Sequence, residues 1–365
     1  MSEPVMRRTQ SGDAMKSLCT PAFRFHSPLA KVLSLCSVLS VLSFVAPLPA
    51  QAATDDSATV YSIPSAKAAD SLLLDVDNAG KRLVAVGDRG HILYSDDDGK
   101  TWTQAKVPSR MLLTAVAFGD DKHGWAVGHD SLVLATTDGG STWTQQFSDQ
   151  EREEGAPFLD VWFKDDNTGF AVGAYGGVYA TTDGGKNWED ASDRLDNPDG
   201  YHLNAITEVK GSGLFIVGEM GSMFRSSDDG ETWETVKGPY EGSLFGVLGT
   251  NEPGTVLAWG LRGNLFRSTD FGTTWTPIKV KSTRGKLEFG LAGGALLKDG
   301  SVVIVGHGGS VLKSTDNGQT FSLINRPDRL SLSSVAADDK GDLVLVGQGG
   351  VHVTSPTGED ASPKQ

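Results

Sequence analysis

An eight-residue motif supplies the carboxylates that stand out first in this sequence. Its pattern is Ser/Thr-x-Asp-x-Gly-x-Thr/Asn-aromatic, and its first copy, residues 95–102, contains the acidic run Asp96, Asp97 and Asp98. Carboxylates grouped in this way could bind Ca²⁺ or hydrogen-bond to a carbohydrate. The central aspartates of the six copies are Asp97, Asp138, Asp183, Asp228, Asp270 and Asp316, and the closing aromatic residues are Trp102, Trp143, Trp188, Trp233, Trp275 and Phe321.

The spacing of the copies favours a structural role. The intervals between the closing aromatic residues are 41, 45, 45, 42 and 46 residues, which is the length of a four-stranded propeller blade. Six copies around a ring cannot all form one active site. In a β-turn, the aspartate would accept backbone N–H groups, the hydroxyls would bond locally, and the aromatic ring would pack between blades. No other His, Cys or Asp cluster has metal-ligand spacing, so we expect no metal ion and no cofactor.

A second pattern, a buried strand that ends in glycine and a tight turn, occurs seven times. Glycine allows the positive φ that such turns need. The seven glycines are Gly87, Gly128, Gly173, Gly218, Gly260, Gly306 and Gly347. Each repeat divides into four short strands, named A to D outward from the ring axis. In the second repeat A is 112–118, B is 124–128, C is 132–136 and D begins at 142.

The seventh repeat has A near 330–336, B at 343–347 and C at 351–354, but it has no D strand. The β-branched segment 58–64 has no hairpin partner nearby. The sequence therefore predicts an all-β fold, a seven-bladed propeller over residues 58–355, in which the N-terminal strand completes the last blade.

The N-terminal region is typical of a secretory signal. Arg24 and Lys31 precede an apolar run at 32–45, and small residues follow up to Ala52. We expect residues 1–52 to be removed after Ala52, with Met15 as an alternative start, and the mature protein to lie in the periplasm. The run is short for a membrane span, and a lipid anchor at Cys36 is disfavoured because the apolar run follows that cysteine. Residues 53–57 should form a flexible start, and 356–365 a disordered tail.

Composition narrows the possible partners. Cys19 and Cys36 both precede the expected cleavage site, which excludes disulfides and thiolate chemistry from the mature chain. The formal net charge is −14, and it becomes −17 without residues 1–52, which leaves 27 Lys and Arg against 44 Asp and Glu. Such a protein should be soluble and should not bind nucleic acid or an anionic membrane surface. We expect a monomer.

Together the two patterns resemble Asp-box (BNR) repeats, and in particular the family of the photosystem II assembly and stability factor. The motif at residues 95–102 and the Val-Gly-x-x-Gly turn at 86–90 carry the resemblance, which extends over about residues 58–355. We name each copy of the eight-residue motif an Asp box. The resemblance implies a non-enzymatic scaffold that binds a membrane or envelope protein client. Similar chains in bacteria without photosystems imply other clients.

A glycan-binding or sialidase-like propeller is the alternative, because Asp boxes also occur in sialidases. A sialidase would carry a Phe/Tyr-Arg-Ile-Pro motif, but this chain has Tyr61, Ser62, Ile63 and Pro64, with serine in the place of the substrate-binding arginine. Serine cannot reproduce the two-pronged guanidinium contact with a carboxylate.

Arginines and long loops mark the candidate binding surface. In a propeller the B–C turns and D–A connections share one face, and the long D–A loops at 148–157 and 190–201 belong to it. Arginines there would suit carboxylates of a client polypeptide. The candidates are Arg89 and Arg262 in B–C turns, and Arg110, Arg284 and Arg329 just before A strands near the axis; the alternative is separate surface arginines paired with acids such as Asp88 or Glu288.

Overall fold

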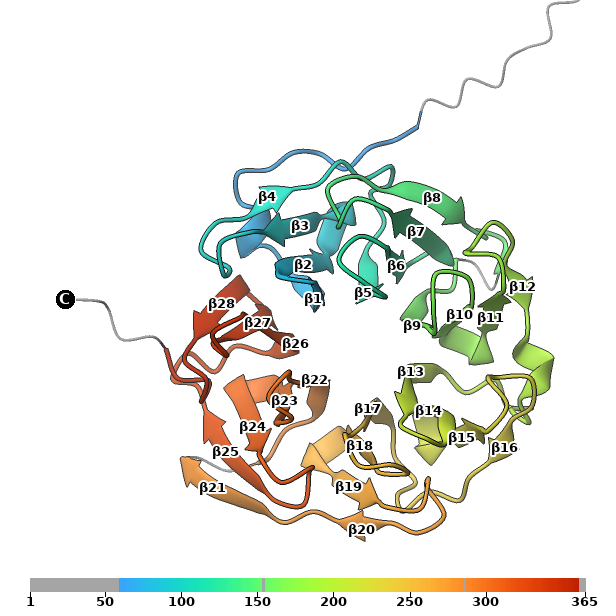
Figure 1. Ribbon diagram of the computed structural model, residues 1–365, viewed down its shortest axis with the longest axis vertical. Coiled ribbons are helices and arrows are strands. Elements are labelled where there is room, and N and C mark those ends of the chain that lie inside the picture. The colour runs from blue at the N-terminus through green and yellow to red at the C-terminus, as the bar shows by residue number, and fades with distance from the viewer. Residues whose placement is uncertain (1–58, 153–154, 285–286, 361–365) are drawn as a thin grey trace, which may run out of the picture. The chain divides into compact units, whose positions relative to one another are not determined.

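The computed structural model describes residues 59–152, 155–284 and 287–360, all of which belong to the unit Ser57–Gln365. The expected signal peptide, the start at 53–57 and the last five residues lie outside the described residues. Within the described residues seven sheets, antiparallel apart from one outer strand, are arranged in a ring (Figure 1), and a cavity lies along the ring axis. The described residues include no helix that is both long and apolar enough to cross a membrane.

The strands follow the A to D order within each sheet. The A strands, which line the channel, are β1 (Leu73–Ala79), β5 (Leu113–Phe118), β9 (Phe158–Phe163), β13 (Leu203–Val209), β17 (Leu244–Gly249), β22 (Leu291–Leu296) and β26 (Leu332–Ala337). The B strands are β2 (Arg82–Gly87), β6 (Gly124–Gly128), β10 (Gly169–Gly173), β14 (Gly213–Gly218), β18 (Val256–Gly260), β23 (Val302–Gly306) and β27 (Leu343–Gly347).

The outer strands of most blades are shorter than the inner ones. The C strands are β3 (Ile92–Ser95), β7 (Leu132–Thr136), β11 (Val178–Thr181), β15 (Met223–Ser226), β19 (Leu265–Ser268), β24 (Ser310–Ser314) and β28 (Gly350–Thr354). The D strands are β4 (Thr103–Gln104), β8 (Thr144–Phe147), β12 (Glu189–Asp190), β16 (Glu234–Thr235), β20 (Thr276–Pro277) and β25 (Phe321–Asn325). A further strand, β21 (Val280–Arg284), pairs in parallel with β25 on the outer edge of the sixth blade.

Single turns of 3-10 helix complete the described elements. They are η1 (Ala68–Asp70), η2 (Asp88–Gly90), η4 (Ala174–Gly176), η5 (Ser192–Arg194), η6 (Glu219–Gly221), η7 (Leu261–Gly263) and η8 (His307–Gly309). All except η1 and η5 are B–C turns.

The sequence predicted the seven blades correctly, but the described residues do not show the predicted closure of the ring. The last sheet contains three strands, β26, β27 and β28. The segment that was expected to complete it runs beside the first blade, where the Ser62 N–H donates to the Val107 carbonyl and the Gln104 side chain donates to the Ile63 carbonyl. A lone β-branched segment can satisfy its backbone on either neighbouring blade, and its sequence does not say which.

The hydrophobic core is divided into seven clusters, each between two neighbouring blades. One cluster contains Val84 and Val86 of the first blade together with Val116, Leu134 and Trp143 of the second. Its Asp-box tryptophan therefore packs across the blade boundary, as predicted. The B strands β6, β10, β18, β23 and β27 are buried at every position.

The glycine that ends each B strand is required by a close backbone approach. At Gly173 the backbone is extended, with φ of −171°, so positive φ is not the reason for glycine there. A Cβ atom on Gly173 would lie 2.3 Å from the Pro157 carbonyl oxygen at the start of β9, and Gly306 has the same relation to Gly290 at 2.4 Å. The positive φ falls on later residues of the turn, such as Tyr175.

We expect Gly173→Ala to destabilise the fold by about 1–3 kcal/mol, since the added methyl would force the backbone of β9 to move. Thermal unfolding followed by circular dichroism measures the change. Gly119→Ala is the matched control, because its Cβ would meet nothing nearer than the Trp125 ring at 3.7 Å. Equal melting temperatures for the two variants would contradict the close-approach explanation.

Candidate functional site

The Asp-box carboxylates are fully engaged in their own turns. In the first box the Asp97 carboxylate accepts the Thr101 N–H at 2.8 Å, the Thr101 hydroxyl at 2.7 Å and the Ser95 hydroxyl at 2.9 Å. These hydrogen bonds, above all that from the Thr101 side chain, hold the pKa of Asp97 down to about 2. The other five boxes repeat the bonds, which are the ones predicted for a structural turn.

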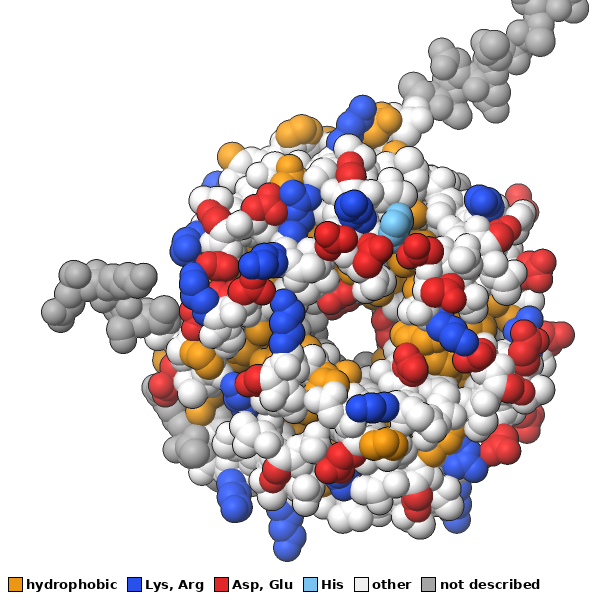
Figure 2. Space-filling view, in the orientation of Figure 1, with side chains coloured by type: hydrophobic (Ala, Val, Ile, Leu, Met, Phe, Trp, Pro, Cys, Tyr) orange, Lys and Arg blue, Asp and Glu red, His pale blue; other side chains and the backbone are white. Residues whose placement is uncertain are grey.

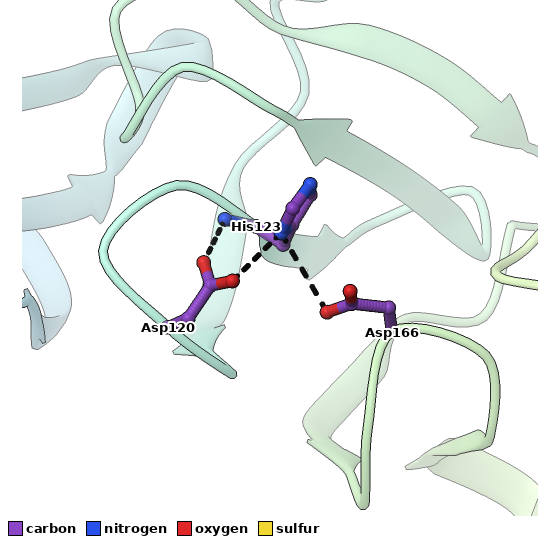
Figure 3. A group of neighbouring side chains, drawn as sticks. All are labelled: Asp120, His123 and Asp166. Carbon is purple, nitrogen blue, oxygen red and sulfur yellow. Dashed lines mark hydrogen bonds and ion pairs between the residues drawn. The ribbon is translucent and has the colours of Figure 1, made fainter.

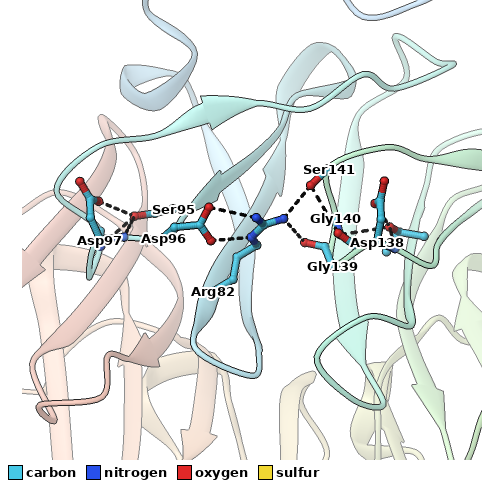
Figure 4. Close-up of polar contacts among 10 residues, drawn as sticks. Arg82, Ser95, Asp96, Asp97, Asp138, Gly139, Gly140 and Ser141 are labelled. Atoms are coloured by element: carbon cyan, nitrogen blue, oxygen red, sulfur yellow. Dashed lines mark hydrogen bonds and ion pairs between the residues drawn. The ribbon is translucent and has the colours of Figure 1, made fainter.

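Arginines fasten neighbouring Asp boxes to each other. The Arg82 guanidinium donates Nε to Asp96 at 2.7 Å and Nη2 to the same carboxylate at 2.9 Å, while Nη1 reaches the Gly139 carbonyl and the Ser141 hydroxyl of the next blade (Figure 4). Arg225 makes the same kind of link from the fourth blade to Phe271 and Thr273 of the fifth. The Asp-box face is therefore held by its own polar contacts.

Side chains on the A strands join the blades around the channel. The Asp75 carboxylate of β1 accepts the Val116 N–H of β5, and that of Asp160 on β9 accepts the Ile206 N–H of β13, both at 2.8 Å. Between these pairs the Thr114 hydroxyl donates to the Phe158 carbonyl at 2.7 Å. The innermost strands have no strand on their channel side, so these bonds satisfy backbone groups that would otherwise remain unpaired.

These channel carboxylates titrate far from the usual range. Burial raises the pKa of Asp75 and of Asp77 to about 6, and that of Asp160 to about 7, against the hydrogen bonds that favour the ionised form. The side chains are half-buried and border a cavity of about 990 Å³ along the ring axis. Figure 2 shows acidic side chains around the channel mouth near β5 and β9, and basic ones over β26–β28.

One group of ligand-type side chains was missed by the sequence analysis. His123 Nδ1 lies 2.8 Å from Asp120 Oδ2 and 3.6 Å from Asp166 Oδ1, and the ligand atoms of the three residues lie within 4.8 Å of one another (Figure 3). Asp166 comes from the next blade, which is why no local spacing revealed the group. A cation would have to displace the proton that Nδ1 donates to Asp120, so we interpret the group as an ion pair between blades.

The B–C face differs from the Asp-box face in what it exposes. Each B–C turn is joined to the start of its A strand by a backbone bond, such as that from the Ala174 N–H to the Pro157 carbonyl, so the turns and D–A connections share one face as predicted. In the described part of the chain, every large exposed apolar residue outside the N-terminal segment 60–63 belongs to this face. They are Leu72, Met111, Tyr175, Met220, Phe245, Leu261 and Phe289.

Two of the five candidate arginines are exposed on the B–C turns. Arg89 and Arg262 occupy equivalent turn positions with φ of 57° and 59°, and both are exposed. Arg89 pairs with Asp88 at 3.3 Å, with its side chain 79% exposed. Arg329 lies over the Phe289 ring, 5.8 Å from the ring centre.

Of the remaining two arginines, Arg110 lies just before an A strand as predicted, whereas Arg284 does not. Arg110 donates Nε to the Tyr61 carbonyl at 2.7 Å, so it holds the N-terminal segment. Arg284 ends β21, the outermost strand of the sixth blade, so its position near the axis was predicted wrongly. The chain adds a parallel strand to the blade edge before it turns inward to β22, a detour that the length of the connection did not reveal.

The long D–A loops are fastened to the scaffold. Arg152 in the first loop donates to the Ser131 hydroxyl at 2.9 Å and to the Ala174 carbonyl at 2.6 Å, which joins two B–C turns. In the second loop the Arg194 side chain donates Nη1 to the Gly230 carbonyl of the next blade at 3.0 Å. Hydrogen bonds thus hold the loops in place beside the B–C turns.

The repeated turns and closed ring define an Asp-box β-propeller. Residues 93–104 match the BNR/Asp-box repeat. Residues 100–159 and 150–289 match the family described as photosynthesis system II assembly factor YCF48, over more than half of the chain. The chain belongs to this YCF48 family.

Solved structures agree on the fold. A YCF48 bound to a D1 peptide is 19% identical, with a TM-score of 0.59 over 78% of this chain and 91% of that one. YCF48 from Cyanidioschyzon merolae is also 19% identical, with a TM-score of 0.61 over 80% and 97%. A streptogramin B lyase, 10% identical, has a TM-score of 0.64 over 78% and 95%. The fold alone is therefore shared with an enzyme. A search of curated proteins found no match.

The sialidase alternative gains no support at the position where it was tested by sequence. Ser62, which stands in the place of the substrate-binding arginine, is buried, and its N–H is bonded to Val107. A buried hydroxyl there cannot meet the carboxylate of a sugar.

The raised pKa of Asp160 makes stability depend on pH. The folded protein holds this proton more tightly than the unfolded chain, so the stabilisation is greatest at low pH and is lost as the pH rises through about 7. We expect the melting temperature to fall less between about pH 5 and about pH 8 in Asp160→Asn than in the unmodified protein. Asp196→Asn, an exposed loop substitution, should leave the pH dependence unchanged. An identical fall in all three proteins would show that Asp160 is ionised throughout.

The hydrogen bond to Asp120 raises the pKa of His123 above the ordinary value for a histidine. An NMR titration of the imidazole ring should show this, and Asp120→Asn should lower the pKa, because the charged acceptor is lost. A His123 pKa that does not respond to Asp120→Asn would contradict the ion pair.

Proposed function

We propose that this protein is an exported, non-enzymatic scaffold whose B–C face binds a segment of a membrane or envelope protein and assists its assembly or stability. The observation that carries the proposal is the pair Arg89 and Arg262, which lie at equivalent positions of two B–C turns. These turns are on the face opposite the Asp boxes, in a protein that is acidic overall. Membership of the YCF48 family supports it, and a YCF48 has been solved with a bound D1 peptide.

Electrostatics suit this role better than nucleic-acid or lipid binding. With a formal net charge of −14 the protein repels polyanions, whereas exposed arginines can pair with individual carboxylates of a polypeptide. The signal-like region at 1–52 places the scaffold in the periplasm under this proposal, where it would meet membrane proteins before they are assembled.

Charge reversal tests the proposal. Arg89→Glu with Arg262→Glu should abolish capture of the client when tagged protein is purified from solubilised envelopes. The melting temperature should change little, because both side chains are exposed and an exposed ion pair such as Arg89–Asp88 contributes little stability. Lys122→Glu with Lys186→Glu makes the same charge change on the Asp-box face and should capture normally. The intact mass of the purified protein should show that residues 1–52 have been removed.

Capture that survives the double reversal would overturn the assignment of this face. A glycan array and a glycoside-hydrolase screen on the same preparation should both be silent, and a positive result in either would favour the glycan alternative.

A further inference from the structure

Five exposed apolar side chains lie on the B–C face, spread over four neighbouring blades. The apolar arc consists of Tyr175, Met220, Phe245, Leu261 and Phe289, whose exposed fractions are 55%, 61%, 37%, 39% and 41%. They come from the third to sixth blades in order. Exposed apolar residues that gather on one face of a soluble protein can mark a binding surface.

Neighbouring residues link some members of the arc. The Tyr175 ring meets the edge of His202 at 4.9 Å, and His202 faces Glu219, the residue before Met220, at 3.8 Å. At the other end, Phe245 lies within 3.6 Å of a Cβ built on Gly290, next to Phe289. Phe245 also borders the central cavity, so the arc runs beside the channel mouth.

The backbone under Tyr175 and Met220 is one that glycine would adopt more easily. Their φ angles are 56° and 52°, in the left-handed region where bulky side chains are uncommon. The equivalent turns of the sixth and seventh blades have glycine, Gly308 and Gly349, with φ of 67° and 82°. The chain therefore keeps two large apolar side chains, exposed, at positions where they cost conformational energy, which is a pattern associated with function.

We infer that the apolar arc binds an extended, apolar polypeptide segment, and that Tyr175 and Met220 are its anchors. The inference rests on the proposed scaffold function and adds the kind of segment that is recognised. Tyrosine gives a large contact area at low entropic cost, and methionine adapts to different side chains. Arg262 and Arg329 at one end of the arc would set the direction of a segment that carries an acidic group.

A lipid bilayer is the less suitable occupant. Glu219 lies within the arc, and the loops beside it carry Asp193, Asp196 and Asp199. Binding to a bilayer would bury these carboxylates among lipid headgroups, which is unfavourable. Binding to a peptide can leave the carboxylates in water.

Substitution by glycine gives a test in which folding is protected, because glycine relieves the left-handed strain. Tyr175→Gly with Met220→Gly should keep or raise the melting temperature. The probe is a phage-displayed library of random dodecapeptides, selected on the unmodified protein. We expect selected peptides to share two or more large apolar residues, and the double glycine variant to weaken their binding at least about tenfold in fluorescence anisotropy.

Asp229→Gly is the matched control. It removes a side chain from a left-handed position with φ of 59° on the Asp-box face, and it should bind the peptides normally. Met220→Leu should also retain binding, because it preserves apolar contact. Unchanged affinity in the double glycine variant, or selection of peptides without apolar residues, would overturn the inference.

The outcome separates this inference from the proposed function. If the double glycine variant still captures the client from solubilised envelopes, the scaffold function stands and the apolar arc has no part in it. Sedimentation of the unmodified protein with phosphatidylcholine vesicles, lost in the double glycine variant, would overturn the inference in favour of a lipid surface.

Discussion

The ring depends on how its innermost strands meet across the channel. Each A strand pairs with one neighbour only, so adjacent blades are joined at the axis by side chains that bond to the backbone of the next blade. Asp75, Thr114, Asp160 and Asn204 make four successive links of this kind. A buried N–H or carbonyl group without a hydrogen-bond partner destabilises a protein. These bonds give partners to the backbone groups on the open edge of the A strands, so no further strand is needed there. The raised pKa values of the two aspartates result from that position.

Further from the ring axis, neighbouring blades are joined by apolar packing and by arginine side chains. Apolar clusters fill the space between B and C strands of neighbouring blades, and beyond them the Asp-box tryptophans cover the boundary. On the Asp-box face the arginines add polar links, as Arg82 does between Asp96 and Gly139. On this face, therefore, Asp-box and arginine side chains serve to hold the blades together.

Features that repeat along the chain were predicted correctly from the sequence. β6 and β7 begin and end at the predicted residues, and the Asp-box bonds of Asp97 are those expected of a turn. Contacts between blades could not be predicted in the same way, since their partners lie some forty residues apart in no fixed pattern. His123 meets Asp166, Ser62 binds Val107, and Arg284 ends an added outer strand; each depends on which neighbour a short segment meets. The arginine candidates were chosen by their position in the repeat. That position indicates the face of the ring but not the distance from its axis.

Most non-glycine residues with left-handed backbone are polar on both faces, but the apolar exceptions differ between the faces. Left-handed residues on the Asp-box face are mostly polar, as Asp98, Asp229 and Asn317 are, and short polar side chains tolerate that conformation. Phe271 is bulky, but its ring packs against Phe215, so packing compensates for its strain. Tyr175 and Met220 are bulky and remain exposed, and no comparable burial compensates for theirs. Within the chain the Tyr175 ring meets only His202, at its edge, and this conformational cost supports the proposal that another molecule supplies further contacts on the B–C face.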